Sequence, residues 1–174
     1  MRVLQYLWFH FITVGTSWLP DLRPVPWLRG LLLRPSFKSC AGNLQVARHV
    51  TINFTNRVEI GSDVFIATGC WLHAGGGIVL EDEAQLGPYA VLVTGDHTQV
   101  EGSYRFGPSR LAPIRVCQGA WVAAHATVTK GVVIGRGALV AANSVTCHDV
   151  PPFTIAGGVP ARVIQKKSRF EVVR

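Results

Sequence analysis

The sequence predicts an all-β fold in which short parallel strands wind into a triangular solenoid of hexapeptide repeats. Residues 116–145 divide into five hexads, VCQGAW, VAAHAT, VTKGVV, IGRGAL and VAANSV, each beginning with Val or Ile and carrying Ala, Val or Ser in fifth place. The same frame returns upstream in IGSDVF (60–65), IATGCW (66–71), LEDEAQ (80–85) and LGPYAV (86–91). A helix repeats at about 3.6 residues and a strand at about two, so a lasting six-residue period indicates coils of short strands.

Each hexad is expected to supply one side of a coil, with the large aliphatic residue pointing inward and the small residue letting the chain turn. Stacked coils then bury a continuous column whose two ends stay open. The apolar N-terminal segment is a natural cap for one end, and Pro151-Pro152 marks the end of the last coil. We therefore expect an N-terminal segment 1–40, a solenoid 41–152 and a C-terminal basic tail 153–174.

The N-terminal segment is apolar and aromatic. Residues 3–20 contain no Lys, Arg, Asp or Glu, and three aromatic residues fall within Tyr6–Phe9. We expect a helix that either packs on the body or on a neighbouring subunit, or makes a peripheral membrane contact through residues 1–20. A bilayer span is not favoured, because the apolar part is slightly short and polar residues interrupt it. A secretory signal would need a more basic start and an A-x-A-like exit.

The net charge of +7 lies at the two ends of the chain. Residues 1–40 and residues 161–174 each carry five Lys or Arg and one acid, which makes +8 and leaves −1 for residues 41–160. No nucleic-acid partner is expected, because neither a basic groove nor a recognition motif accompanies the charge. The basic ends suit phosphates of a small ligand or an anionic membrane surface.

The cysteines favour a reducing compartment. Cys40, Cys70, Cys117 and Cys147 form no CxxC pair and no Cys/His cluster at zinc spacing. This pattern predicts unpaired, mostly buried thiols and no metal. It fits a cytoplasmic protein, at or near the inner face of the membrane.

The hexad frame breaks after Leu92 and resumes near Ile114. Residues 97–113, HTQVEGSYRFGPSRLAP, form an expected excursion loop with His97 at its root. Long loops on a rigid scaffold commonly carry function, and an imidazole with a pKa of about 6.5 can accept a proton near neutral pH. On the residues alone, His97 is either a general base or an ordinary surface histidine. Asp96 is not an implied partner, because neighbours in an extended segment point to opposite sides.

The hexads resemble those of the hexapeptide-repeat acyltransferase family, which folds as a left-handed parallel β-helix. The span 46–164 is similar to the maltose/galactoside and polysaccharide O-acetyltransferase branch, most specifically in GAWVAAHATVTKGVVIGRGALVAANSV (119–145) and DVPPFTIAGGVPARVIQKK (149–167). The resemblance implies a homotrimer with each active site between two subunits, His97 as the general base, and acetyl-CoA as co-substrate. The implied acceptor is a sugar hydroxyl in cell-surface polysaccharide or lipopolysaccharide synthesis.

The resemblance also assigns residues to coenzyme A. Small residues at Ala124 and Ala142 would line a groove for the pantetheine arm, Trp121 would lie near the thioester, and basic tail residues would hold the phosphates. Cys147-His148 replace a Thr-Lys pair of some members, which weakens one phosphate or adenine contact. The implied cofactor-binding residues are Trp121, Ala124, Ala142, Cys147, His148, Arg162, Lys166 and Lys167.

The acceptor is where the resemblance departs from the disaccharide enzymes. Those enzymes hold the sugar with an Asn and an Asp, and the matching positions here are Ala67 and Gly75. A glycan or lipid-linked glycan near a membrane is therefore expected instead of a free disaccharide. His73 and Glu101 are candidate substrate-binding residues, and Glu101 is also a candidate to orient His97.

Two alternative functions stay open. HTQVEGSYRF is similar to the loop of xenobiotic acetyltransferases that inactivate antibiotics, although those carry a further insertion. The other alternative is a non-catalytic hexapeptide-repeat scaffold, which would need neither His97 with its loop nor the basic tail.

Overall fold

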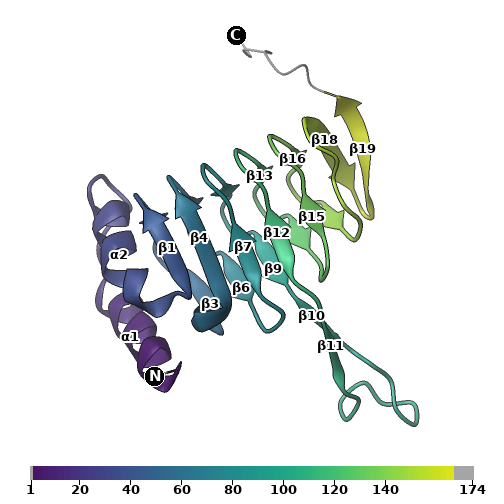
Figure 1. Ribbon diagram of the computed structural model, residues 1–174, viewed down its shortest axis with the longest axis horizontal. Helices are drawn as coiled ribbons and strands as arrows, with labels where there is room; N and C mark the ends of the chain where they lie inside the picture. Colours follow the sequence, from purple (N-terminus) through teal and green to yellow (C-terminus); the bar gives the residue numbers. More distant parts are fainter. Residues whose placement is uncertain (1, 167–174) are drawn as a thin grey trace.

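The computed structural model describes residues 2–166 as a rod that is capped at one end by two helices (Figure 1). The helices are α1 (Arg2–Gly15) and α2 (Val25–Leu33), and short 3-10 turns form η1 (Arg34–Ser36) and η2 (Thr55–Arg57). The strands wind into a triangular solenoid of about six coils, which confirms the fold class predicted from the hexads.

The strands stack into three faces, named here in the order in which the chain meets them. The first face holds β1 (Ser39–Gly42), β4 (Val58–Ser62), β7 (Ile78–Leu80), β12 (Ile114–Val116) and β15 (Val133–Ile134). The second holds β2 (Gln45–Val46), β5 (Phe65–Ile66), β8 (Gln85–Leu86), β13 (Trp121–Val122), β16 (Leu139–Val140), β18 (Thr154–Gly158) and β19 (Ala161–Lys166). The third holds β3 (Thr51–Asn53), β6 (Trp71–His73), β9 (Val91–Val93), β14 (Thr127–Val128) and β17 (Val145–Thr146). Neighbouring strands of a face are parallel, apart from the antiparallel pair β18–β19.

The interior is a column of aliphatic side chains at the hexad positions. Burial of apolar surface contributes roughly 25 cal/mol per Å², so this column is the main source of stability for the rod. The first residues of the hexads are fully buried, and the residues in fifth place are nearly so: Val116, Val122, Val128, Ile134 and Val140, with Ala120, Ala126, Val132, Ala138 and Ser144.

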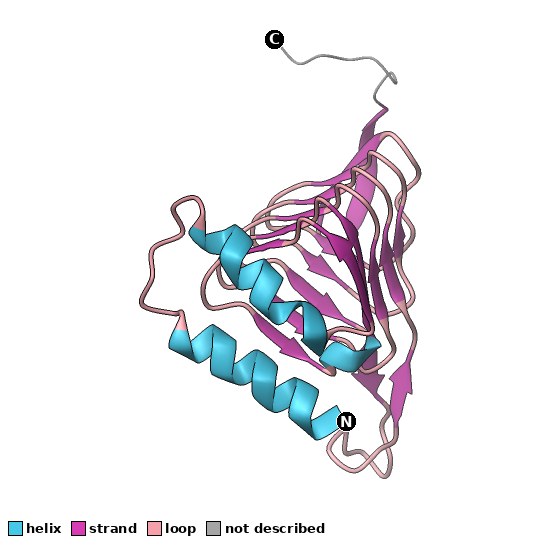
Figure 2. Ribbon diagram, turned by 60° about the vertical axis from the view of Figure 1, so that its left-hand side comes forward, coloured by secondary structure: helices cyan, strands magenta, loops and turns pink. Residues whose placement is uncertain are grey.

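The two helices cover the open end of the first coil (Figure 2). Phe9 and Ile12 of α1 and Leu33 of α2 belong to the same buried cluster as the first-coil residues Leu44 and Val46. Helix α1 therefore packs on the body of the rod through the side that carries Phe9 and Ile12, as one of the expected arrangements requires. Among the described residues, no helix is both long enough and apolar enough to cross a bilayer.

A buried ion pair joins the cap to the first two coils. Arg29 is 1% exposed, and its guanidinium donates to Asp21 (3.1 Å) and to the carbonyl oxygen of Val46 (2.8 Å). Asp21 also accepts hydrogen bonds from the Thr68 hydroxyl (2.7 Å) and the Arg48 backbone N–H (2.9 Å). One of the basic residues of segment 1–40 is therefore used inside the fold and is not free for a ligand.

The excursion is a two-stranded ribbon that extends away from the rod (Figure 1). β10 (Gly95–His97) pairs antiparallel with β11 (Ser109–Leu111), and His97 lies opposite Ser109. The chain leaves the solenoid at Gly95, two residues before the expected root, and returns at β12 as expected.

Parallel pairing also continues past residue 152, where the tail was expected to begin. Ile155 and Ala156 of β18 pair with Leu139 and Val140 of β16, so the second face gains a strand after Pro151-Pro152. β19 then turns back along β18 and forms the outer edge of this face.

The four cysteines are unpaired, but they differ in exposure. Cys70 is buried, and burial raises the pKa of its thiol to about 11. Cys40 and Cys117 are half-buried, whereas Cys147 is exposed. The expectation of mostly buried thiols therefore holds fully only for Cys70.

Candidate active site

The irregular segments of the rod gather at one corner. We call the corner where third-face strands end and the chain turns toward the first face the loop corner. It carries residues 54–57, residues 74–77, the ribbon with its flanks (94–113), residues 129–132 and residues 147–149. Stacking of coils brings these five segments to one edge of the molecule, although they are far apart in the sequence.

His97 stands at this corner on β10, with its side chain exposed. Asp96, its neighbour, turns to Lys130 on the next coil, with 3.3 Å between Lys130 Nζ and Asp96 Oδ2. Adjacent residues of an extended strand point to opposite sides, so the Asp96 carboxylate faces away from His97. Within residues 2–166, no side chain hydrogen-bonds to the His97 ring, so its orienting group is not supplied by the described part of a single chain.

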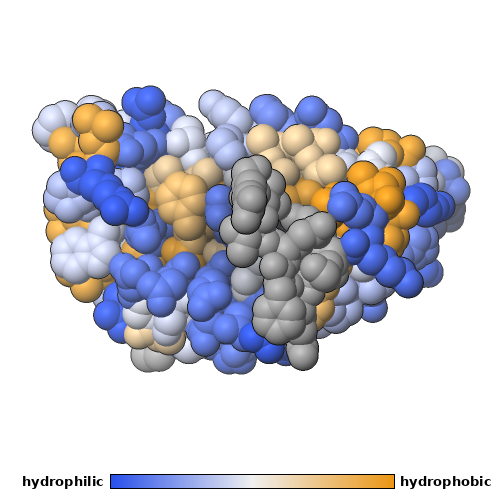
Figure 3. All heavy atoms as spheres, turned by 90° about the horizontal axis from the view of Figure 1, so that it is seen from above, coloured by the Kyte–Doolittle hydropathy of each residue, from blue (hydrophilic) through white to orange (hydrophobic). Residues whose placement is uncertain are grey.

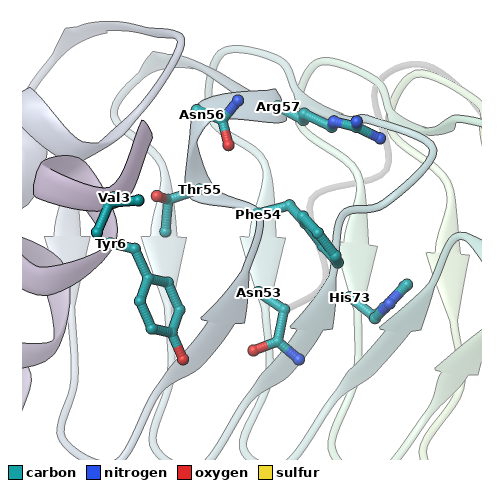
Figure 4. A pocket seen from close by; sticks show the side chains of 8 residues that line it. All are labelled: Val3, Tyr6, Asn53, Phe54, Thr55, Asn56, Arg57 and His73. Atoms are coloured by element: carbon teal, nitrogen blue, oxygen red, sulfur yellow. The ribbon is translucent and has the colours of Figure 1, made fainter. Parts of the chain in front are cut away.

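A pocket of about 630 Å³ lies at the same corner, toward the cap (Figure 4). Figure 4 shows Tyr6 of α1 on one side, His73 of β6 on the other and Phe54 between them. The walls combine aromatic rings with amide and guanidinium groups, a mixture typical of small-molecule sites. The lining residues are Val3, Tyr6, Asn53, Phe54, Thr55, Asn56, Arg57 and His73.

His73 is the sequence-predicted residue that the structure places in this pocket. Its ring meets Phe54 edge to face, with 5.3 Å between ring centroids and an interplanar angle of 82°. Nδ1 of His73 is buried and finds no hydrogen-bond partner within the described residues. A buried ring nitrogen without a partner is unusual in a folded protein, and a ligand would reach it only after the ring or its neighbours move.

Arg57 and Gly75 complete the wall around His73. The Arg57 guanidinium stacks over Phe54, 5.5 Å from the ring centroid, and donates to the Gly75 carbonyl oxygen. A Cβ atom on Gly75 would lie 2.8 Å from Cε1 of His73, so a larger residue there would collide with the imidazole. Ala67, the other acceptor position taken from the resemblance, is buried at a different corner, where the second face meets the third.

Sequence reasoning missed Tyr6, Asn53, Phe54 and Arg57. Phe54 occupies a turn position with a φ of 61°, where the hexad frame gives no reason to expect a functional ring. Tyr6 was noticed only as part of an apolar helix. The pocket forms where the cap packs on a coil. The local sequence of either segment therefore does not predict it.

The predicted coenzyme A residues fall on three regions of the rod. Trp121 is exposed on β13 of the second face, and Arg162 and Lys166 are exposed on β19 of the same face. Ala124 and Ala142 lie at the corner where the second face meets the third, and Asn143 donates its N–H to the Ala124 carbonyl. Cys147 and His148 lie at the loop corner instead, at the far edge of the third face. Lys167 lies outside the described residues.

Glu101 stands in the outer turn of the ribbon, between Val100 and Ser103, which pair with each other. It is exposed, and no hydrogen bond or ion pair joins it to His97 in the structure of residues 2–166. The described residues also contain no cluster of three or more His, Cys, Asp or Glu that could hold a metal ion.

Comparison with known proteins relates this chain to acetyltransferases. No protein-family model matches the chain. It is 28% identical over 135 residues to a Staphylococcus aureus (strain COL) protein assigned as an acetyltransferase, covering 78% of this chain and 68% of that protein. It is 24% identical over 138 residues to the galactoside O-acetyltransferase of Escherichia coli K12, covering 79% and 68%.

Solved structures agree in fold along nearly the whole rod. A hexapeptide-repeat acetyltransferase of Vibrio cholerae, crystallised with acetyl-CoA, aligns with a TM-score of 0.81 at 25% identity over 96% of this chain and 87% of that one. The maltose O-acetyltransferase of Clostridium difficile aligns with a TM-score of 0.82 at 24% identity over 97% and 89%. The coils are those of a left-handed parallel β-helix. In sequence and in fold, this chain is similar to the hexapeptide-repeat acetyltransferases.

Proposed function

We propose that this protein transfers the acetyl group of acetyl-CoA to a hydroxyl of a sugar, with His97 as the general base. The observation that carries the proposal is the position of His97. It stands exposed on a ribbon held by the solenoid, at the same corner as a pocket lined by aromatic and amide groups. The acetyl-CoA complex of the V. cholerae relative supports the choice of donor.

The chemistry asks little of the chain beyond positioning and proton transfer. A ring nitrogen of His97 takes the proton of the acceptor hydroxyl while its oxygen attacks the carbonyl carbon of the thioester. The C–S bond then breaks, and the protonated imidazole returns the proton to the departing sulfur of coenzyme A. The products are an acetyl ester and free coenzyme A, so atoms and charge balance without a metal or an oxidant.

The homotrimer belongs to the same proposal, and the outward side chains of the second face support it. The second face presents Phe65, Trp121, Leu139 and Ile155, whereas the first face presents charged groups such as Glu59 and Arg115. Apolar exposed faces suit contact between subunits. Trp121 lies on the second face, whereas His97 lies at the loop corner one coil earlier, so in the proposed trimer a second copy would bring a thioester near Trp121 to His97.

The proposed donor site uses the same residues as the resemblance. Ala124 and Ala142 leave room for the pantetheine arm at their corner, and Arg162 and Lys166 supply positive charge on β19 for the phosphates. Cys147 and His148 are kept as candidate contacts to a phosphate or to the adenine of coenzyme A. Glu101 is kept as a candidate contact to the acceptor, and Lys167 is kept as a candidate contact to the phosphates of coenzyme A.

The proposed acceptor is a glycan or lipid-linked glycan of cell-surface polysaccharide or lipopolysaccharide synthesis. Gly75 stands at the position where the disaccharide enzymes are expected to carry an Asp that holds the sugar, so the pocket lacks that carboxylate. The absence of a side chain at Gly75 also leaves room for the His73 ring. Aromatic rings offer stacking instead, and the unpaired His73 Nδ1 would offer one hydrogen bond once movement of the ring or its neighbours exposes it. Residues of α1 line this pocket, which suits an acceptor at the inner face of a membrane.

The test is release of free thiol from acetyl-CoA by the purified protein, with and without candidate glycans. We expect release that depends on the glycan, and a decrease of about 10²–10⁴-fold in His97→Ala. His49→Asn is the matched control, because His49 is exposed in the first coil, three coils from Ala124, and its φ of 60° is tolerated by Asn. Unchanged turnover in His97→Ala removes the mechanism, and absence of coenzyme A binding favours the non-catalytic scaffold.

A further inference from the structure

Helix α1 is apolar on two opposite sides. Its inner side buries Phe9 and Ile12 against the first coil. Its outer side carries Leu4, Leu7 and Phe11, which are 70%, 56% and 69% exposed. Residues spaced by three and four share one side of a helix, so these three form a stripe that the rod does not cover.

Helix α2 repeats this arrangement. Pro26, Arg29 and Leu33 are buried on its inner side, while Trp27, Leu28 and Leu31 are exposed on its outer side. The Trp8 indole of α1 donates to the Leu32 carbonyl of α2 (2.7 Å), so the two helices are held side by side. We call their joint outer surface the cap face; its apolar members are Leu4, Leu7, Trp8, Phe11, Trp18, Trp27, Leu28 and Leu31.

Helices α1 and α2 lie across one end of the rod (Figures 1 and 2), and the exposed side chains of the cap face are on the side that the rod does not cover. Viewed from above, orange hydrophobic residues appear among polar ones at this helical end (Figure 3). A large exposed apolar surface on a folded domain marks a contact with a partner. Three of its members are tryptophans, a residue type enriched at the boundary between water and lipid. The indole N–H groups of Trp8 and Trp18 donate within the cap, to the Leu32 and Gly15 carbonyl oxygens.

The charged residues around the cap face indicate whether its partner carries positive or negative charge. Asp21 is the single acidic residue between positions 3 and 38, and it is engaged by Arg29 and Arg48. Arg23 and Arg34 are exposed, and neither forms an ion pair with a described residue, although the Arg34 guanidinium donates to the Cys40 and Ala41 carbonyl oxygens of β1. The rim is therefore positive, so two copies facing each other would bring like charges together, whereas an anionic surface would match them.

We infer that the cap face binds the surface of an anionic lipid bilayer, with α1 and α2 lying in the interface and the rod directed away from it. The contact extends past the first 20 residues, because Trp27, Leu28 and Leu31 of α2 share it. The inference does not depend on acetyl transfer and is tested without it. Val3 and Tyr6 continue from α1 into the pocket beside His73, so this orientation places the pocket mouth next to the lipid headgroups.

The experiment is flotation of the full chain with vesicles of phosphatidylcholine alone or mixed equally with phosphatidylglycerol. We expect binding to the mixed vesicles that weakens as salt rises, because screening reduces the attraction between charges. Phe11→Glu should lower vesicle affinity by about tenfold or more, since it places a carboxylate in the interface. Phe106→Glu is the matched control, because Phe106 is 78% exposed on the distant ribbon, and it should bind like the unchanged protein.

Two further measurements make the outcome decisive. Brominated lipids should quench the fluorescence of the cap tryptophans when the protein binds. Thermal unfolding should show that Phe11→Glu remains folded. Failure to bind the mixed vesicles, or equal losses in Phe11→Glu and Phe106→Glu, would overturn the inference. It would also be overturned if sedimentation without lipid showed cap-to-cap pairing of copies that Phe11→Glu abolishes. Loss of thiol release in the earlier assay leaves this result unaffected, so the two proposals fail separately.

Discussion

Lys130 reaches from the turn after β14 to Asp96 on β10, with 3.3 Å between Nζ and Oδ2. This contact joins the base of the ribbon to the next coil of the solenoid. Asp96 is thereby held toward the rod, and His97 on the same strand faces the other way. Asp96 thus helps to hold the ribbon in position and is not a partner of the His97 imidazole.

The first prediction concerns this ion pair. Lys130→Met should lower kcat by about tenfold, because a small displacement of His97 weakens its alignment with the hydroxyl. Thermal stability should change little, since an exposed pair contributes about 0.2–1 kcal/mol. Lys38→Met is the control, because Lys38 forms a similarly exposed pair with Glu59 on the first face. Equal effects of the two substitutions on kcat would argue against a positioning role.

The second prediction concerns the pocket at the loop corner. His73→Ala or Phe54→Ala should raise KM for the acceptor by about tenfold, because each removes ring contact and the former also removes the free nitrogen. KM for acetyl-CoA should stay unchanged and serves as the internal control. Steady-state kinetics with each substrate varied in turn measures both values. A parallel rise in both KM values would instead indicate a general distortion of the coil.

The third prediction concerns the buried pair in the cap. Asp21→Asn should lower the free energy of unfolding by about 3 kcal/mol, because the Arg29 guanidinium is left buried without its anion. Guanidinium chloride unfolding followed by tryptophan fluorescence measures the change. Asp63→Asn is the control, since Asp63 is exposed, accepts a hydrogen bond from Asn43 and has a φ of 59° that Asn tolerates. A loss below about 1 kcal/mol would show that the cap tolerates a neutral partner for Arg29.

The same carboxylate gives a prediction for pH. Burial raises the pKa of Asp21, but hydrogen bonds from Thr68, the Arg48 backbone and Arg29 outweigh it and hold the pKa below its ordinary value of 3.8. A lowered native pKa contributes stability that is present above the unfolded pKa and is lost as pH falls through the native one. The stability difference between the unchanged protein and Asp21→Asn should therefore be full near neutral pH and shrink below about pH 3.8. A difference that persists unchanged into that acid range would contradict the assignment.

The fourth prediction concerns the thiols. Iodoacetamide should alkylate Cys147 first, because it is exposed, and Cys70 last, because burial raises the pKa of its thiol to about 11. Burial also raises the pKa of Cys40 and Cys117, so these should react at intermediate rates. If Cys147 lies beside bound coenzyme A as proposed, saturating coenzyme A should slow its alkylation, and peptide mass spectrometry reads each site. Alkylation of Cys147 at the same rate with coenzyme A present would remove it from the proposed donor site.

Some features of the fold were readable from local sequence and others were not. Val122 and Ile134 could be placed in the core because every coil must repeat the same inward residue, and that repetition is visible without knowledge of any contact. The ribbon could be expected from the lost frame after Leu92, but its start at Gly95 depends on the pairing of Gly95 with Leu111. Strand β18 could not be predicted, because Pro151-Pro152 indicates the end of the last coil. In the structure Ile155 nevertheless pairs with Leu139.

The candidate site divides in the same way. His97 could be named from its place at the root of an irregular segment and from the family that the hexads resemble. Phe54, Tyr6 and the free nitrogen of His73 could not be named as one pocket, because they come from a turn, a capping helix and a strand of the next coil. The two apolar sides of α1 were equally ambiguous, since an apolar helix in a sequence does not reveal which side meets the core.

The repeated hexads were therefore sufficient for the solenoid, and the apolar N-terminal segment was sufficient for the cap. The candidate base came from the break in the hexad frame together with the family resemblance. Which side chains meet at the loop corner, which arginine is buried and which side of the cap stays open depended on how coils and helices stack. Stacking brings together residues 20 or more positions apart, such as His73 and Val93 in neighbouring strands or Asp21 and Thr68 across the cap. Those contacts are set by burial and hydrogen bonding in three dimensions, and the hexad period is the same whether or not they form.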